Sequence, residues 1–268
     1  MPNETVTHSI LKAKGPLLEW AEDEVVREVP LTIHYNGEEI ATLLCSPYQT
    51  EELVYGFLLN EGFIRVPEDV YTIRHDPADH LVWVEGKPCV LQKELMSKRF
   101  VSACCGKSRA SFCFANDVLM VKPLTSTHSI PLQEAYGYVK FLETNSPLYD
   151  LTRGVHSGGV GYQGKVLLTS YDIGRHNVFD KLSGSAFHTE LNLDNHVIFF
   201  SGRVSSEILL KVAKMKVPIL IARGAPTDMA LSQAVALNIT VLGFAREQSL
   251  NIYTCPDRIG SPTNRPVC

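Results

Sequence analysis

The chain has 268 residues, a formal net charge of −4 and 45% hydrophobic residues, which is typical of one large or two smaller globular domains. The near balance of charge gives no support to nucleic-acid binding, and no apolar run reaches the roughly 20 residues of a membrane-spanning helix. Residues 1–8 lack a basic start and an apolar core, so we expect no signal peptide and no membrane partner. The seven cysteines are odd in number and irregularly spaced, which favours a reducing cytoplasm over a secreted disulfide framework.

The N-terminal half is predicted to be mixed and mostly extended. In chain order, its predicted elements are two strands within residues 30–45, a helix over 50–60, and strands over 70–74 and 80–85. Asn36–Gly37 is a strong hairpin signal, and Thr50 is the expected cap of the helix. A connection near 123–131 leads to the second half, so we expect a smaller α+β domain over residues 1–127.

The second half alternates strands and helices. Strands are predicted at 166–171, 197–200, 217–222 and 239–244, and helices at about 177–186, 205–216 and 228–237. Elements of these lengths in this order indicate βαβ units. We therefore predict an α/β fold class, with a mostly parallel sheet in a C-terminal domain over residues 128–268.

An arginine lies at the carboxyl end of each of these strands: Arg175, Arg203, Arg223 and Arg246. Parallel sheets bind ligands beyond the carboxyl ends of their strands, where helix N-termini attract anions. The planar guanidinium group suits phosphate in bidentate geometry. Each arginine alone reads as a surface residue in a loop, but together the arginines predict a pocket for a nucleotide or a pyrophosphate-bearing cofactor.

The adjacent cysteines Cys104 and Cys105 precede Gly106 and two basic residues, Lys107 and Arg109. Neighbouring positive charge lowers the pKa of a thiol, and the thiolate is the form that acts as a nucleophile. The pattern therefore favours reactive sulfur. A vicinal disulfide, half of a metal site and a pair of buried thiols remain open alternatives, as does a Cys–His pair with His156 or His176, although each histidine is more often structural.

Other motifs are incomplete. Gly106-Lys107-Ser108 resembles the end of a phosphate-binding P-loop, but that motif requires glycine at position 101, which is valine. Zinc deaminases need His-x-Glu and Pro-Cys-x-x-Cys, and Cys89 lacks the second cysteine. Adjacent cysteines rarely ligate one zinc ion well, so we expect no metal site. Asp180–Lys181 reads as an ion pair on a helix surface.

Several blocks nevertheless resemble the FdhD family of formate dehydrogenase accessory proteins. They are Glu52 to Leu59 with Glu61-Gly62, Cys105-Gly-Lys107, Gly154-Val-His-Ser, Asp172-Ile-Gly-Arg-His-Asn-Val-Phe-Asp-Lys181, Ser201-Gly-Arg-Val-Ser-Ser-Glu207, Ala225-Pro-Thr227 and Leu242-Gly-Phe-Ala-Arg246. The blocks run in order over most of the chain, from about residue 30 to residue 253.

The resemblance implies a sulfurtransferase that acts as a sulfur carrier. It implies that the protein takes sulfane sulfur from a cysteine desulfurase as a cysteine persulfide. The sulfur then passes to the molybdenum (or tungsten) bis-molybdopterin guanine dinucleotide cofactor of formate dehydrogenase, which is bound as a substrate. It also implies a three-layer C-terminal domain like cytidine deaminase without its zinc, and we expect a homodimer.

The resemblance also implies site residues. The family's cofactor-binding stretch corresponds to Phe244, Ala245, Arg246, Glu247, Gln248 and Ser249, to which we add Arg175, His176, Arg203 and Arg223. Many members carry Cys-x-x-Cys before Gly-Lys, whereas Ser102 occupies the first of those positions here. We therefore expect Cys105 to be the catalytic persulfide carrier and Cys104 its helper or alternative. A non-catalytic chaperone that inserts the cofactor is the main alternative, and a nucleotide-processing enzyme is disfavoured because the zinc ligands are missing.

Overall fold

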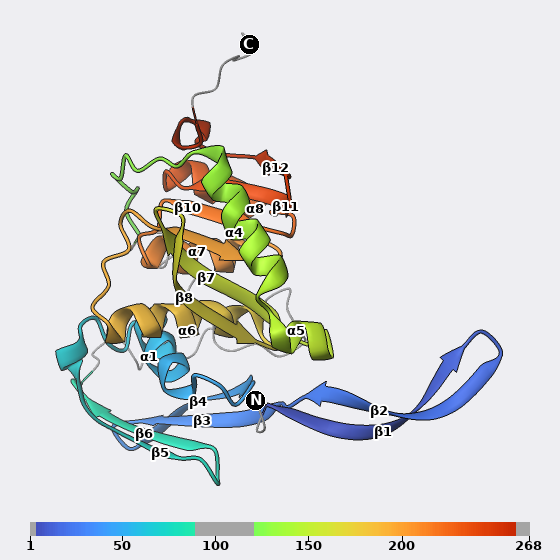
Figure 1. Cartoon of the computed structure of the whole chain (residues 1–268). Helices are drawn as coiled ribbons and strands as arrows, with labels where there is room; N and C mark the ends of the chain where they lie inside the picture. Colours follow the sequence, from blue (N-terminus) through green and yellow to red (C-terminus); the bar gives the residue numbers. More distant parts are fainter. Residues whose placement is uncertain (1–3, 89–120, 261–268) are drawn as a thin grey trace.

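The computed structural model describes residues 4–88 and 121–260 (Figure 1). Its N-terminal elements are β1 (Thr5–Lys14), β2 (Leu17–Val26), β3 (Val29–Tyr35), β4 (Glu38–Cys45), α1 (Thr50–Asn60), the 3-10 turn η1 (Pro67–Asp69), β5 (Val70–Asp76) and β6 (Leu81–Gly86). The remaining elements are α4 (Leu132–Thr144), α5 (Pro147–Thr152), β7 (His156–Tyr162), β8 (Lys165–Asp172), α6 (Arg175–His188), β9 (Val197–Phe200), α7 (Ser206–Lys214), β10 (Ile219–Ala222), α8 (Asp228–Ala236), β11 (Thr240–Arg246), β12 (Ser249–Ile252) and the 3-10 turn η2 (Pro256–Arg258).

The larger sheet has six strands in the order β12-β11-β10-β9-β7-β8. The pairs β9–β10 and β10–β11 are parallel, whereas β7–β8, β7–β9 and β11–β12 are antiparallel. The predicted mostly parallel pairing is therefore wrong, because β7 and β12 were not recognised. Since β7 opposes both of its neighbours, β8 still runs in the same direction as β9, β10 and β11.

Helices cover both faces of this sheet, in three layers. Residues of α6, α7 and α8 share a core with Ile198 and Phe200 of β9. Residues of α4 share a second core with Val197 and Phe199 of the same strand. Neighbouring residues of β9 thus point to opposite faces, as the strand pleat requires. Both faces are buried, which explains the uninterrupted apolar sequence of this strand.

A smaller sheet, in the order β4-β3-β6-β5, carries α1. The predicted Asn36–Gly37 hairpin is present, because β3 and β4 pair antiparallel on either side of it. Thr50 is the first residue of α1 rather than its cap: Gln49 occupies the cap position with φ of 48° and makes no side-chain capping bond. The predicted boundary between residues 1–127 and 128–268 stays a prediction, as does the likeness to cytidine deaminase.

Helices α1 and α6 cross at backbone contact. A Cβ atom on Gly56 would lie 1.7 Å from the carbonyl oxygen of Asp180, and one on Gly184 would lie 1.9 Å from that of Glu52. Both distances are far below van der Waals contact, so only glycine fits at either position. The smaller sheet is therefore held against the larger one through two glycines on facing helices.

Buried charges lie along the same contact, so the predicted surface pair Asp180–Lys181 is wrong. Both side chains are fully buried. Asp180 pairs with Lys211 and accepts a 2.7 Å hydrogen bond from the Nδ2 of Asn60. Lys181 pairs instead with Asp172, which also accepts hydrogen bonds from the backbone N and Oγ of Ser46, each at 3.1 Å. Adjacent residues of a helix point in different directions, and α6 packs against elements on more than one side. Asp180 and Lys181 therefore have different partners.

Within the described ranges, no helix is both long enough and apolar enough to span a bilayer.

Candidate functional site

One edge of the larger sheet carries the predicted arginines. Because β8, β9, β10 and β11 run in the same direction, their carboxyl ends meet at this edge. Arg175 begins α6 directly after β8, and Arg203 and Arg223 follow β9 and β10. Arg246 is the last residue of β11 rather than a loop residue. The antiparallel strand β7 begins at the same edge, which brings Arg153 and His156 there as well.

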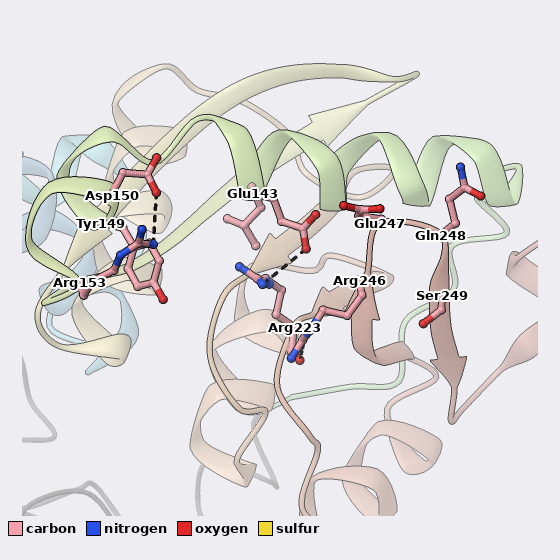
Figure 2. Close-up of a pocket in the computed structure, with 10 residues that line it drawn as sticks. Glu143, Tyr149, Asp150, Arg153, Arg223, Arg246, Glu247, Gln248 and Ser249 are labelled. Atoms are coloured by element: carbon pink, nitrogen blue, oxygen red, sulfur yellow. Dashed lines mark hydrogen bonds and ion pairs between the residues drawn. The ribbon is translucent and has the colours of Figure 1, made fainter. Parts of the chain in front are cut away.

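A pocket of about 710 Å³ opens at the β10–β11 end of this edge (Figure 2). It is lined by Leu142, Glu143, Tyr149, Asp150, Arg153, Arg223, Arg246, Glu247, Gln248 and Ser249. These residues come from the C-terminal end of α4, from α5 and the residue after it, and from the ends of β10 and β11 with the turn to β12. Elements far apart in the sequence therefore line one pocket, and its lining contains both arginines and carboxylates.

Arg246 is fixed in this pocket by backbone acceptors. Its Nη1 donates hydrogen bonds to the carbonyl oxygens of Arg223, at 2.7 Å, and of Ala245, at 2.8 Å. The Nη2 of Arg223 lies 3.5 Å from the Oε1 of Glu143, and Figure 2 shows these two side chains facing one another. Both arginines thus line the same pocket: the guanidinium of Arg246 lies against the backbone of Arg223, and the guanidinium of Arg223 faces the Glu143 carboxylate. An anionic ligand would be attracted to this pair.

Arg153 was missed in the sequence. It lies at the C-terminal end of α5 in the left-handed conformation, with φ of 54°. Its guanidinium carbon is 4.9 Å from the centre of the Tyr149 ring, and its Nη1 is 3.3 Å from the Oδ1 of Asp150. The sequence does contain a signal for Arg153, because this residue directly precedes Gly154 of a family block. Placing Arg153 at the sheet edge, however, requires knowing that β7 begins at His156 and runs antiparallel to its neighbours.

The predicted stretch 244–249 divides in two. Arg246, Glu247, Gln248 and Ser249 line the pocket. Ala245 is fully buried in the core beneath α4, and Phe244 has φ of 51° with its side chain half exposed. Neither of these two lines the pocket. The pairing of β11 with β12 shifts between Gly243 and Arg246, so this stretch contains an irregularity that turns the side chains at the strand end.

Arg175, His176 and Arg203 lie outside the pocket, farther along the edge. The Nε2 of His176 is 3.1 Å from the Oε2 of Glu207, and this hydrogen bond lowers the pKa of the Glu207 carboxyl. Arg203 is exposed. The sheet order places these residues around the ends of β8 and β9, with β7 between the two strands. The structure therefore divides the predicted basic residues into two groups along this edge. One group lines the pocket, and the other, Arg175, His176 and Arg203, lies outside it.

His156 begins β7 and lies within the second of these groups, between the ends of β8 and β9. Its Nδ1 is 3.4 Å from the Oγ of Ser201, which accepts a 2.9 Å hydrogen bond from the backbone N of Ser157. Burial and then the charge of Arg175 lower the pKa of the imidazole. The neutral form is thus favoured.

The predicted sulfur residues Cys104 and Cys105 lie outside the described residues, with Lys107 and Arg109. Of the cysteines that are described, Cys45 is buried and Cys255 half-buried. Burial, followed by the charge of Asp172, raises the pKa of the Cys45 thiol to about 12, so this thiol is unreactive as a nucleophile. Across residues 4–88 and 121–260, no three His, Cys, Asp or Glu side chains form a group that could hold a metal ion.

The three-layer arrangement and the arginines at the strand ends define an α/β protein of the kind that holds ligands at a sheet edge. The sequence model of the FdhD/NarQ family matches residues 26–260, and the chain belongs to this family. It is 40% identical to the sulfur carrier protein FdhD of Halalkalibacterium halodurans over 243 residues, which is 90% of each chain. It is also 41% identical to the protein of the same name from Bacillus subtilis over 239 residues, 89% of this chain and 91% of that protein.

A solved structure shares the fold. It is the crystal structure of a protein described as a formate dehydrogenase accessory protein from Desulfotalea psychrophila, with a TM-score of 0.79 and 23% sequence identity. The match covers 95% of this chain and 99% of the other. The arrangement of both sheets and their helices therefore recurs at low sequence identity.

Proposed function

We propose that this protein carries sulfur for the maturation of formate dehydrogenase in the cytoplasm. Relatives that align over about nine-tenths of the chain are named sulfur carrier proteins. In this proposal the Cys105 thiolate attacks the outer sulfur of a persulfide on a cysteine desulfurase. The new S–S bond forms as the donor's S–S bond breaks, and the donor cysteine leaves as a thiolate. Lys107 and Arg109 favour the thiolate, and Cys104 is the helper or alternative thiol.

The receiving substrate is the molybdenum (or tungsten) bis-molybdopterin guanine dinucleotide cofactor. The observation that carries this part is the pair Arg223 and Arg246 in one pocket, with Arg246 already fixed by backbone acceptors. Two arginines in one pocket suit a pyrophosphate, and this substrate carries two. Glu247, Gln248 and Ser249 supply polar groups beside them. Arg175, His176 and Arg203 form the second basic group on the edge, which suits the second nucleotide arm.

The proposal extends to fold and assembly. The C-terminal layers belong, in this proposal, to the cytidine deaminase-like folds without zinc, and the protein acts as a homodimer. The three layers and the strand-end pocket support the fold assignment. Cysteine desulfurase and formate dehydrogenase are the protein partners, one as sulfur donor and the other as client.

Isotope transfer tests the sulfur step. The protein is incubated with a desulfurase and cysteine labelled with heavy sulfur, and the peptide that gains the mass of one sulfur atom is identified by mass spectrometry. We expect the label on Cys105, its loss in Cys105→Ser, and its retention in the control Cys255→Ser. Label on neither Cys104 nor Cys105 would contradict the sulfur-carrier function.

A second variant distinguishes the sulfur carrier from the alternative, a chaperone that only inserts the cofactor. Replacing Cys104 and Cys105 together by serine should abolish activation of formate dehydrogenase while leaving cofactor binding intact. Unimpaired activation would favour the chaperone instead, because its action depends on the arginine pocket alone.

A further inference from the structure

The imidazole of His156 lies in the second basic group, between the strand ends that carry Arg175 and Arg203. His156 begins β7, and the sheet order places β7 between β8 and β9. Its Nδ1 is 3.4 Å from the Oγ of Ser201, in the loop after β9. Gly202 lies against the same nitrogen, since a Cβ atom there would be 3.3 Å from it. A titratable ring is therefore held among arginines, and no step of the proposed function uses it.

Ser201 can hold this ring in either of its charge states. The backbone N of Ser201 donates a 2.9 Å hydrogen bond to the carbonyl oxygen of Ser157, and the backbone N of Ser157 donates one of 2.9 Å to the Oγ of Ser201. The hydroxyl is thus fixed between two strands. A hydroxyl has one proton to donate and two lone pairs. It can therefore donate to the neutral imidazole, or accept from the protonated one, without losing its bond to Ser157.

Two carboxylates lie in this part of the edge, and both already have partners. Asp172 of β8 is the register partner of His156, but its Oδ2 lies 2.6 Å from the Nζ of Lys181. Its Oδ1 accepts hydrogen bonds from α6 and from the residue before that helix. The Oε2 of Glu207 lies 3.1 Å from the Nε2 of His176. The imidazole of His156 therefore lies beside carboxylates that are committed to other groups.

These surroundings favour a neutral ring while the edge is empty. Burial and then the charge of Arg175 lower the pKa of His156, and the more weakly acting charge of Asp172 raises it. A bound phosphate would reverse this balance, because a negative charge close to an imidazole favours its protonated form. The same phosphate would offset the charge of Arg175, which otherwise opposes protonation. An anion at this group and a proton on His156 should therefore bind cooperatively.

We propose that His156 takes up a proton when a phosphate group of the ligand binds at the second basic group, so that the imidazolium joins Arg175 and Arg203 in holding it. The inference rests on the proposed function, in which this group receives the second nucleotide arm, and it adds a ligand-binding residue there. The proton comes from the solvent and returns to it when the ligand leaves. This part of the edge thus gains a positive charge only while it is occupied.

Calorimetric titration of the full chain with diguanosine pyrophosphate tests the proposal. Both phosphates of this probe are diesters, which do not titrate in the range of about pH 6 to pH 8 where histidine does, so proton uptake belongs to the protein. The heat of binding in two buffers of different ionisation enthalpy gives the number of protons taken up. We expect about one proton per bound probe near neutral pH. The association constant should then rise by up to about tenfold for each unit of decrease in pH.

Three variants assign the proton. His156→Gln keeps a hydrogen-bonding side chain that does not protonate, so it should lose the uptake and bind severalfold more weakly at mildly acidic pH. His128→Gln is the matched control: burial also lowers the pKa of this histidine, but its ring stacks on Tyr162, at the opposite end of β7. That variant should keep the uptake. Arg246→Ala weakens the pocket, and the binding that remains should still take up the proton.

A nuclear magnetic resonance titration checks the assignment without any substitution. The ring protons of His156 should titrate at a higher pH in the presence of the probe than in its absence. Binding without proton uptake, or uptake that persists in His156→Gln, would overturn the role of His156 and leave the cofactor site standing. Absence of binding would overturn both. The isotope-transfer test is independent of all three results, so failure of this inference and failure of sulfur carriage are distinguishable.

Discussion

Lys181 and Asp172 form an ion pair of 2.6 Å between Nζ and Oδ2, and both side chains are completely buried. Asp172 ends β8, Lys181 lies on α6, and both contact Ser46 just after β4. One pair thus joins the last residue of a sheet strand, the helix behind that strand and the smaller sheet. The same Asp172 accepts hydrogen bonds through its Oδ1 from the backbone N of Gly174 and from the Nδ2 of Asn177. The family block from Asp172 to Lys181 is therefore in large part structural.

Replacing Lys181 by methionine should destabilise the protein strongly. The change leaves the carboxylate of Asp172 buried without its cation, which costs about 3–5 kcal/mol. Urea denaturation would measure the loss in free energy of unfolding. Lys12→Met removes a cation from an exposed pair at 4.0 Å and should change that free energy by less than about 1 kcal/mol. Equal effects of the two substitutions would contradict the buried pair.

Alanine at Gly56 should weaken the contact between α1 and α6. The added methyl group meets the carbonyl of Asp180 at 1.7 Å, so the helices must separate, at a cost of about 1–3 kcal/mol or more. Thermal unfolding would show a lower midpoint. Gly137→Ala in α4 is the control, because nothing lies within 4 Å of its Cβ position. That substitution should be stabilising by up to about 1 kcal/mol, through the higher helix propensity of alanine.

Removing the guanidinium of Arg223 or Arg246 should weaken anion binding. Each charged hydrogen bond contributes about 1.5–3 kcal/mol, so Arg246→Ala should lower the affinity for pyrophosphate or guanosine diphosphate by about tenfold or more. Calorimetric titration measures this change. Arg74→Ala removes an arginine that stacks on Trp83 in the smaller sheet, and should leave binding unchanged. Equal binding by Arg246→Ala and the unaltered chain would exclude this pocket as the anion site.

Neutralising Glu143 should have the opposite effect. Its carboxylate balances the charge of Arg223 at 3.5 Å, and an incoming anion must compete with it. Glu143→Gln should therefore bind pyrophosphate more tightly, severalfold at low salt and less at high salt, because salt screens partly exposed charges. Titration at two ionic strengths checks both points. Weaker binding would mean that Glu143 itself contacts the ligand.

Stability should fall as the solution becomes mildly acidic. Burial lowers the pKa of His128, His156 and His196 from the usual 6.5. The folded state therefore binds fewer protons than the unfolded state, and the stabilisation present above about pH 6.5 is lost as the pH falls below it. Urea denaturation on either side of this pH measures the slope. His156→Gln should flatten it, and an unchanged slope would contradict the burial of a neutral imidazole at this position.

The parallel strands could be predicted because strands buried on both faces are short, uninterrupted apolar runs. β9 and β10 are short apolar runs buried on every residue, each followed by arginine. Strand β7 escaped prediction because glycine occupies positions 158, 159 and 161, and glycine weakens a strand pattern. The carboxyl ends of β8, β9, β10 and β11 still lie on one side of the sheet, as predicted. The reason is that β7 is antiparallel to both β8 and β9, so these two strands run in the same direction.

Side-chain partners could not be predicted in the same way. Asp180 and Lys181 are neighbours in sequence, and only the packing of α6 between two layers shows that they have separate partners. The pocket likewise needs α4 and α5, whose residues Glu143 and Arg153 meet the strand ends from elsewhere in the chain. Strands β1 and β2 are a further case, because only the structure shows that residues 5–26 pair into a separate two-stranded sheet.

The hydrogen bonds of Arg246 to two carbonyl oxygens have a consequence for how selectively the pocket binds. A flexible arginine loses side-chain entropy when a ligand immobilises it, by up to about 2 kcal/mol. Arg246 has already lost much of that freedom in the ligand-free protein. Its charge is therefore preorganised, and a ligand whose phosphate groups do not match that fixed position gains little from it. Discrimination among anions at this edge would then come from the rigidity of the site rather than from its charge.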